Sequence, residues 1–143
     1  MEIDLGHWSY NGPDVNIDNM IGFVYCITTC TGKKYVGKKL LSFKKKRKPL
    51  KGNVNCRRFL IESDWKEYCG SSPVLNEYIA THGKDGFILE ILSFQPSKLL
   101  LSYYETKEII DRNALFCDDY YNEVLNCRFR KHKPKDEIHT NNV

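Results

Sequence analysis

The sequence predicts a small α+β domain in which a mixed or antiparallel three-stranded sheet is flanked by helices. Two neighbouring segments rich in β-branched and aromatic residues, 20–29 and 34–41, are joined by a short turn that contains Gly32. A helix pattern at 72–83 precedes a third apolar segment, 86–94, and a long helix pattern follows. The length of 143 residues is that of one domain.

The first two strand segments predict a β-hairpin, because the turn between them is short and glycine provides the conformation that a tight turn requires. The preceding residues 1–19 carry glycine, proline and several Asn and Asp residues, which predicts an irregular arm. We expect the arm to pack its aromatic residues, Trp8 and Tyr10, on the domain.

Residues 42–56 show no hydrophobic periodicity and contain proline and glycine, which predicts a loop or a flexible insertion rich in lysine. A short helix is expected at 57–68. A clearer helix begins at Ser72-Pro73, since serine caps a helix and proline suits its first position, and it ends at Gly83. The third strand, 86–94, precedes the longest helix, 97–113. We place the domain at 20–128, with a polar tail at 129–143.

Charge is distributed very unevenly along the chain. Residues 19–61 contain twelve lysines and arginines and no acidic residue, whereas the remainder carries ten basic and all eighteen acidic residues. A basic run is often only a solvated surface or a targeting patch. A field of this strength also favours a polyanion, with nucleic acid the first candidate. We expect contacts to DNA from the residues of this region, namely Lys38, Lys44, Lys45, Lys46, Arg47, Lys48, Lys51 and Arg57.

Other classes of protein find little support in the sequence. No apolar run approaches the ~20 residues that span a bilayer, and the N-terminus lacks a secretory pattern, so we expect a cytoplasmic protein without a membrane partner. The six cysteines form no Cys-x-x-Cys pair and lack zinc-like spacing to histidine. Free thiols are the simpler interpretation, and a structural zinc site is the alternative.

Two tyrosines stand on the expected hairpin, in Gly22-Phe23-Val24-Tyr25 and in Tyr35-Val36-Gly37. Tyrosine in a sheet usually serves packing. The two elements, ten residues apart, nevertheless resemble the signature of the GIY-YIG nuclease family. The first element departs from it, because Phe23 and Val24 replace the usual Gly and Ile and glycine lies one place earlier. The later motifs follow in the family's order, so the resemblance covers about residues 20–123.

The resemblance implies the remaining site residues. In the long helix Glu105 lies between the apolar Leu101 and Ile109 at helical spacing, and the family's glutamate in this helix ligates a divalent metal, here Mg²⁺ with Mn²⁺ as a substitute. By its residue type alone, Glu105 would be an edge residue paired with Lys107 or with the basic region. Asn122, which follows two tyrosines, matches the family's asparagine that supports the site, although it would otherwise be interpreted as a turn residue.

The family's arginine has no clear counterpart. If residues 42–56 are an insertion, Arg57 or Arg58 begins the matching helix, and Arg58 is preferred with Arg47 as the rival. Lys38 and Lys39, beside the signature glycine, are further candidates to reach the phosphate. The segment from Ser63 to Ser72 is similar to that of phage-type members and is expected to shape one wall of the cleft.

The resemblance implies a metal-dependent endodeoxyribonuclease acting on double-stranded DNA. Tyr25 would activate or orient the attacking water, Tyr35 would hydrogen-bond the water or the phosphate, and nearby cations would have to lower the pKa of Tyr25 for it to act as a base. Because one metal site cuts one strand, we expect double-strand cleavage to proceed by nicking first or through a dimer assembled on DNA. The alternative is a non-catalytic nucleic-acid-binding module with a basic hairpin. A small inhibitor or structural protein is a third interpretation that no feature favours.

Overall fold

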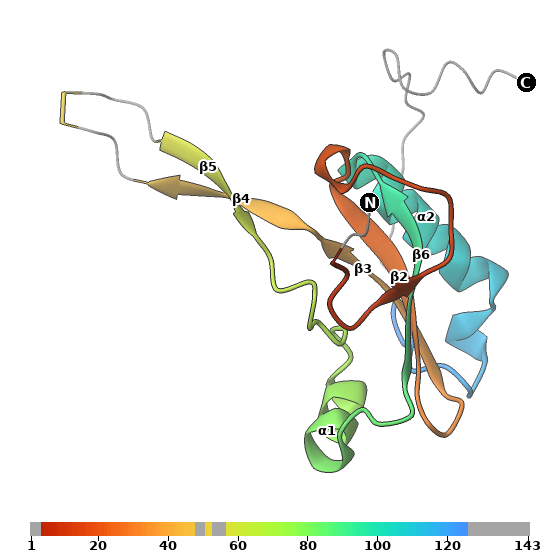
Figure 1. Ribbon diagram of the computed structural model, residues 1–143. Coiled ribbons are helices and arrows are strands. Elements are labelled where there is room, and N and C mark those ends of the chain that lie inside the picture. Colours follow the sequence, from red (N-terminus) through yellow and green to blue (C-terminus); the bar gives the residue numbers. More distant parts are fainter. Residues whose placement is uncertain (1–3, 48–50, 53–56, 126–143) are drawn as a thin grey trace, which may run out of the picture.

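The computed structural model describes residues 4–47, 51–52 and 57–125. Its main sheet has four strands in the order β1-β6-β2-β3, formed by β1 (Ser9–Tyr10), β6 (Ile88–Gln95), β2 (Gly22–Thr28) and β3 (Lys34–Leu40). Two helices accompany the sheet, α1 (Pro73–His82) and α2 (Lys98–Asp111). A second, two-stranded sheet consists of β4 (Ser42–Arg47) and β5 (Arg57–Glu62), and it projects away from the main sheet (Figure 1).

The three expected strands are present and antiparallel, since β2 pairs with both β3 and β6. A fourth strand, β1, pairs in parallel with the outer edge of β6, so the sheet has one strand more than the three that were expected. β1 is only two residues long, and this is too short for a periodic pattern to reveal. Trp8, which precedes it, is buried in the core as expected.

The capping residues predicted for α1 are found in the structure. Ser72 accepts a hydrogen bond from the backbone N–H of Leu75, and Gly83 closes α1. Ser97 caps α2 in the same way. Two short 3₁₀ helices complete the described elements, Ile17–Asn19 and Ala114–Phe116.

The region between β3 and α1 differs from the sequence expectation. Residues 42–47 form a strand rather than a loop, and residues 57–62 form its antiparallel partner rather than the start of a helix. Both expectations were wrong for one reason. Four of the six residues of β4 are consecutive cations, and in β5 two cations precede three consecutive apolar residues, so neither sequence alternates between apolar and polar residues as a strand pattern would. We call β4 and β5 together the ribbon.

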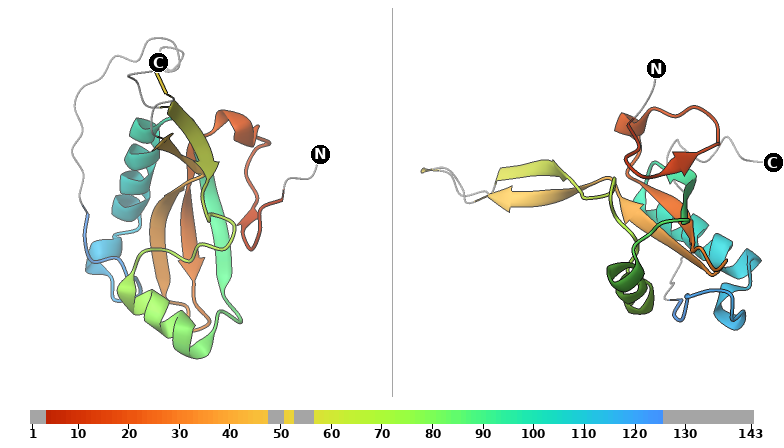
Figure 2. Two further views of the ribbon diagram at one scale, coloured as in Figure 1. Left: turned by 90° about the vertical axis from the view of Figure 1, so that its left-hand side faces the viewer. Right: turned by 60° about the horizontal axis from the view of Figure 1, so that its bottom comes forward.

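Both faces of the main sheet are covered (Figure 2). One face carries a core built around Phe23, Tyr25 and Ile27, and the N-terminal segment, Trp65 and α1 pack against it. The other face carries Val24, Cys26 and Val36, packed against Leu101 and Ile109 of α2. β2 is therefore buried on both faces, which explains its unbroken run of apolar residues. Of the expected site residues, Tyr25 lies in β2, and Tyr35, Lys38 and Lys39 lie in β3, the outer strand beside it.

Candidate active site at the edge of the sheet

Tyr25 lies in the central strand with only 1% of its surface exposed. On the side of β6 its strand is interrupted by a β-bulge: Val24 pairs with Ser93 and Tyr25 with Ile91, so Leu92 has no partner in the register. Bulges are frequent beside active sites because they change the direction in which side chains project. Tyr25 is thus held by the core and stands next to a local irregularity of the sheet.

Gly37 explains how the Tyr25 ring reaches the outer strand. The two residues are partners in the β2–β3 register, and a Cβ atom at position 37 would overlap the hydroxyl group and Cζ of Tyr25. Gly70 closes the other side, where a Cβ atom would lie 3.3 Å from the same hydroxyl oxygen. The signature glycine is therefore required by the space that the tyrosine side chain occupies.

Two further tyrosines gather at this point. The ring of Tyr35 lies 6.2 Å from that of Tyr25, centroid to centroid, and the Tyr35 hydroxyl group shares a hydrogen bond of 2.9 Å with the hydroxyl group of Ser71. The ring of Tyr68 meets Tyr25 edge-on at 6.1 Å, and the two hydroxyl groups are hydrogen-bonded. Tyr68 and Ser71 were not assigned a role from the sequence. Their segment was singled out only as a wall of the cleft, because no motif marks individual residues in it.

The pKa of Tyr25 is shifted in the direction opposite to the one expected for a base. Burial raises the pKa well above its ordinary value, and Tyr35, Tyr68 and the charge of Glu105 raise it further. Burial also raises the pKa of Tyr35, although the hydrogen bond with Ser71 opposes this. Burial and the three neighbouring groups all raise the pKa of Tyr25, so they keep this hydroxyl group protonated at neutral pH.

Glu105 stands on α2 as a half-buried carboxylate between the buried Leu101 and Ile109. Burial raises its pKa, and the charge of Lys38 partly opposes that shift. Within the described part of the chain it has no hydrogen bond or ion pair. Lys107, the partner considered for it from the sequence, binds Asp111 at 2.6 Å instead.

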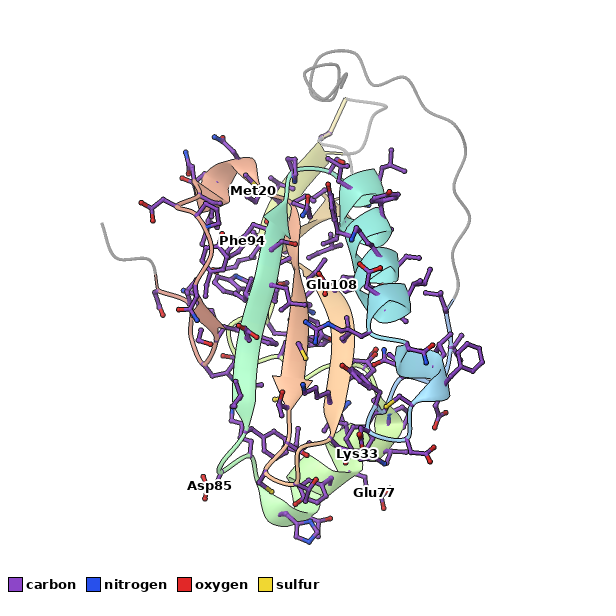
Figure 3. All side chains as sticks on the ribbon, turned by 90° about the vertical axis from the view of Figure 1, so that its right-hand side faces the viewer. Met20, Lys33, Glu77, Asp85, Phe94 and Glu108 are labelled. Atoms are coloured by element: carbon purple, nitrogen blue, oxygen red, sulfur yellow. The ribbon has the colours of Figure 1, made fainter. Side chains whose placement is uncertain are left out.

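Glu108, one turn further along α2, has the partner that Glu105 lacks. Glu108 lies between α2 and the sheet (Figure 3), and it accepts a hydrogen bond of 3.0 Å from Arg112. Glu105 has no such arginine. Its charge instead raises the pKa of Tyr25 and Tyr35, so the carboxylate is close enough to act on the tyrosine hydroxyl groups although α2 covers the other face of the sheet.

The chemistry of Glu105 fits a divalent cation. A half-buried carboxylate without a donor loses hydration that a bound cation would replace. The described residues contain no group of three or more His, Cys, Asp or Glu side chains placed to hold a metal. A single carboxylate suits Mg²⁺, which keeps several of its waters and takes few ligands from the protein.

Lys38 and Lys39 project to opposite faces of β3. Lys38 donates a hydrogen bond of 2.6 Å to the hydroxyl group of Ser102 on α2. Lys39 lies on the tyrosine face, where it forms an ion pair of 2.7 Å with Asp64 and lies 4.0 Å from the centre of the Tyr68 ring. Between β3 and the first turn of α2 runs a groove of about 360 Å³, lined by Lys38, Lys39, Leu40, Lys98, Leu101 and Ser102.

Asn122 is buried at the outer edge of β3. Its side-chain amide donates to the carbonyl oxygen of Val36 at 2.8 Å and accepts from the backbone N–H of the same residue at 3.0 Å. Val36 stands between Tyr35 and Gly37, so Asn122 holds the strand on which both residues depend without lying among the tyrosine hydroxyl groups.

Most of the expected DNA-binding residues whose backbone the structure describes belong to the ribbon or to the turn beyond it, whereas Lys38 lies on β3. Lys51 is exposed in a turn, and Lys48 lies outside the described residues. Arg58 is opposite Lys46 in the register of the ribbon, so it does not begin the helix that was expected there. The remaining residues belong to the strands of the ribbon, Lys44, Lys45, Lys46 and Arg47 in β4 and Arg57 in β5.

A known protein family matches this chain. Residues 8–125, from the residue before β1 to just beyond Asn122, match a family model described as "Putative endonuclease segE, GIY-YIG domain". Neither the curated proteins nor the solved structures give a match. Of the helices that the structure describes, none has the length and apolar character to cross a membrane. The match covers most of the chain, including both tyrosines, Glu105 and Asn122, and the chain therefore belongs to the GIY-YIG nuclease family.

Proposed function

We propose that this protein is a divalent-metal-dependent endonuclease that hydrolyses phosphodiester bonds in double-stranded DNA. The observation that supports the proposal most directly is Glu105, a half-buried carboxylate that has no described hydrogen-bond partner and acts electrostatically on two tyrosine hydroxyl groups. A helix residue with a purely structural role would be expected to have a partner, as Glu108 does.

Glu105 would hold the metal, Mg²⁺ or Mn²⁺ in its place. When bound, the cation would supply positive charge that stabilises the developing charge at the phosphate and at the leaving oxygen. The contribution of the chain is to keep one carboxylate ionised and unpaired. Lys38 assists, because its positive charge opposes the rise in the pKa of Glu105.

The tyrosines have separate tasks in this proposal. Tyr25 is protonated at neutral pH, so it orients the attacking water through its hydroxyl group instead of removing a proton from it. Tyr35 lies nearer to solvent, and its hydroxyl group can exchange the bond to Ser71 for one to a phosphate oxygen. Tyr68 fixes the Tyr25 hydroxyl group, and Asn122 fixes the strand that carries Tyr35.

Neutralising the phosphate requires cations near the tyrosines. Lys38 and Lys39 meet this need from β3, and Lys98 adds a third positive charge to the groove beside them. Lys39 would have to leave Asp64, an exchange that costs little because the carboxylate is exposed. Arg58, and its rivals Arg47 and Arg57, would reach the DNA from the ribbon and bind phosphates next to the cleaved one.

The alternative is a non-catalytic module that binds nucleic acid through the basic region. That module would need the positive charge but would have no use for an unpaired carboxylate close to DNA phosphates.

One metal site cuts one strand at a time. We therefore propose that double-strand cleavage proceeds through nicks, or through two copies assembled on DNA.

The experiment that tests the function is plasmid cleavage with Mg²⁺, with Mn²⁺ and with chelator, followed over time. We expect nicked circles before linear product with either metal, and no product in chelator. Glu105→Ala should abolish cleavage and leave DNA binding intact, whereas Glu108→Ala, which removes a carboxylate from the same helix, should still cleave. Full activity in chelator would overturn the metal requirement, and an active Glu105→Ala variant would overturn the site.

A further inference from the structure

The groove between β3 and α2 carries positive charge that the described structure does not neutralise. Its lining comes from two elements, with Lys38, Lys39 and Leu40 on β3 and Lys98, Leu101 and Ser102 on α2. Lys98 is exposed, and it has no hydrogen bond or ion pair with any residue that the structure describes. Among the same residues, no acidic side chain lines the groove. A concave surface with several cations and no acid favours an anion.

One contact holds two donors of the groove together. Lys38 donates to the hydroxyl group of Ser102 at 2.6 Å. An ammonium group has three N–H donors, and a hydroxyl group has a proton of its own. Lys38 therefore keeps two donors for a further acceptor, and the proton of the Ser102 hydroxyl group is available as well. The ammonium group of Lys39, in contrast, is bound to Asp64.

The groove continues along α2 from Glu105. Ser102 precedes Glu105 by three residues and Lys98 precedes it by seven, so the three side chains lie on one face of the helix. At about 1.5 Å per residue, the row from Glu105 to Lys98 is about 10 Å long. Phosphates of one strand follow each other at about 3.4 Å along the axis of a duplex. The row is therefore long enough for a phosphate at Glu105 and for its neighbours on the same strand.

The lining of the groove suits the sugar–phosphate backbone better than the bases. Leu101 is buried and Leu40 is half-buried, and together they supply apolar surface for a deoxyribose ring. The volume of about 360 Å³ is near the lower end of the range for sites that bind small organic groups. Among the described residues that line it there is no aromatic ring on which a base could stack. Contacts to phosphate position DNA without reading its sequence.

We propose that this groove binds a phosphate that neighbours the cleaved one on the same DNA strand, with Lys98, Ser102 and Lys38 as the donors. The inference rests on the proposed function and adds to it a second phosphate site, which is independent of sequence. It also gives the cleaved strand a path, from Glu105 along the first turns of α2 to the end of β3 at which the chain enters the ribbon (Figure 2). Lys98 and Ser102 would bind the substrate without touching the reacting atoms.

The salt dependence of DNA binding in chelator gives the first test. Lys98→Gln should flatten the slope of log affinity against log salt by about 0.9, the contribution of one phosphate, on duplexes of unrelated sequence alike. Lys98→Arg keeps the charge and should keep the slope. Lys107→Gln is the matched control, because Lys107 lies on the opposite face of the same helix and pairs with Asp111. An equal slope for Lys98→Gln and Lys107→Gln would overturn the proposal.

Duplexes with a single neutral methylphosphonate locate the phosphate that the groove contacts. In Mg²⁺ and at low enzyme concentration, the unaltered protein should cut slowly at the bond whose neighbouring phosphate is the neutral one, because the contact in the groove is lost. The offset is counted from the methylphosphonate itself, so no target sequence is needed. Lys98→Gln lacks the contact already, and the neutral group at that offset should slow it no further. The same slowing in both proteins would contradict the proposal.

The two tests keep this inference apart from the proposed function. A slope that Lys98→Gln lowers and Lys107→Gln does not, without cleavage in Mg²⁺, would contradict the nuclease and support the phosphate site. Cleavage in Mg²⁺ with slope and offset unchanged by Lys98→Gln would contradict the phosphate site alone. Lys98 is exposed in the first turn of α2, so Lys98→Gln should melt at the original temperature, and melting curves exclude unfolding as the cause of a lost contact.

Discussion

The side chain of Asn122 makes with the backbone of Val36 the two hydrogen bonds that a neighbouring strand would make. An edge strand otherwise leaves its N–H and carbonyl groups without a partner in the sheet. The chain around Asn122 continues this contact, since the N–H of Tyr121 donates to the carbonyl oxygen of Lys34 at 2.7 Å. The end of the domain thus fixes the strand that carries Tyr35 and Gly37.

Replacing Asn122 should therefore act through the strand edge. Asn122→Ala leaves the buried N–H and carbonyl group of Val36 without partners, at an expected cost of about 1–3 kcal/mol in the free energy of unfolding. Asn122→Asp can accept from the N–H but repels the carbonyl oxygen, and it should regain stability under mildly acidic conditions, where the introduced carboxyl group is protonated and can donate. Thermal melting at neutral and acidic pH measures this recovery of stability. A loss of stability that does not depend on pH would contradict the prediction.

Gly37→Ala should impair the protein by crowding Tyr25. Gly37 has no positive φ, so the cost arises from the overlap of the new methyl group with the tyrosine ring and not from backbone strain. Overpacking of this kind costs about 1–3 kcal/mol. Combining it with Tyr25→Ala should relieve the overlap, so the two changes should cost less together than the sum of their separate effects. Additive free energies of unfolding would mean that the two residues are not coupled.

Tyr25→Phe and Tyr35→Phe separate packing from chemistry, because each removes one hydroxyl group and keeps the ring. We expect cleavage to fall by about 10²-fold or more for a hydroxyl group that handles the attacking water. The loss in stability should stay near ~1 kcal/mol, since one hydrogen bond is removed in each case. Single-turnover cleavage rates and melting curves give both numbers. Cleavage at the original rate by both variants would refute the proposed roles.

Glu105→Gln should stabilise the protein while it abolishes cleavage. Burial raises the pKa of Glu105 in the folded state, so the folded protein holds this proton more tightly than the unfolded chain. The charged form is therefore a cost that appears as pH rises through the raised pKa and is absent below the ordinary value for glutamate. The gain from Glu105→Gln should be present at neutral pH and disappear in acid. Melting curves across this range, without metal, test the sign, and a loss of stability at neutral pH would contradict it.

The sequence predicted those elements whose signals are local. The cap Ser72 and the terminating Gly83 predicted α1, the long helix pattern predicted α2, and the apolar segments predicted β2, β3 and β6. β1 and the ribbon were missed because neither has a periodic apolar pattern of sufficient length. A polar strand is stabilised by its partner rather than by its own pattern, and the partner cannot be deduced from the strand itself.

The candidate site stays a prediction, and the sequence could name only those of its residues that a motif marks. Tyr25, Tyr35, Glu105 and Asn122 all belong to the matched family region. Tyr68 and Ser71 reach the tyrosines through a loop whose path depends on Gly70, which has a φ of +92° and lies against both rings. The pKa of Tyr25 was expected to fall, because the sequence shows neighbouring lysines but not the burial that outweighs them.

The base of the ribbon closes on itself. The chain leaves the main sheet at Leu41 and returns at Ser63, and the N–H of Ser63 donates to the carbonyl oxygen of Leu41 at 2.9 Å. The two ends of the segment of twenty-one residues between them are therefore neighbours, so the segment is a branch that the rest of the domain does not need for its connection. A short turn in their place should leave the tyrosines and Glu105 where they stand. Recognition and cleavage would then be exchangeable parts, so a branch of different length or charge could redirect the same nuclease to other DNA.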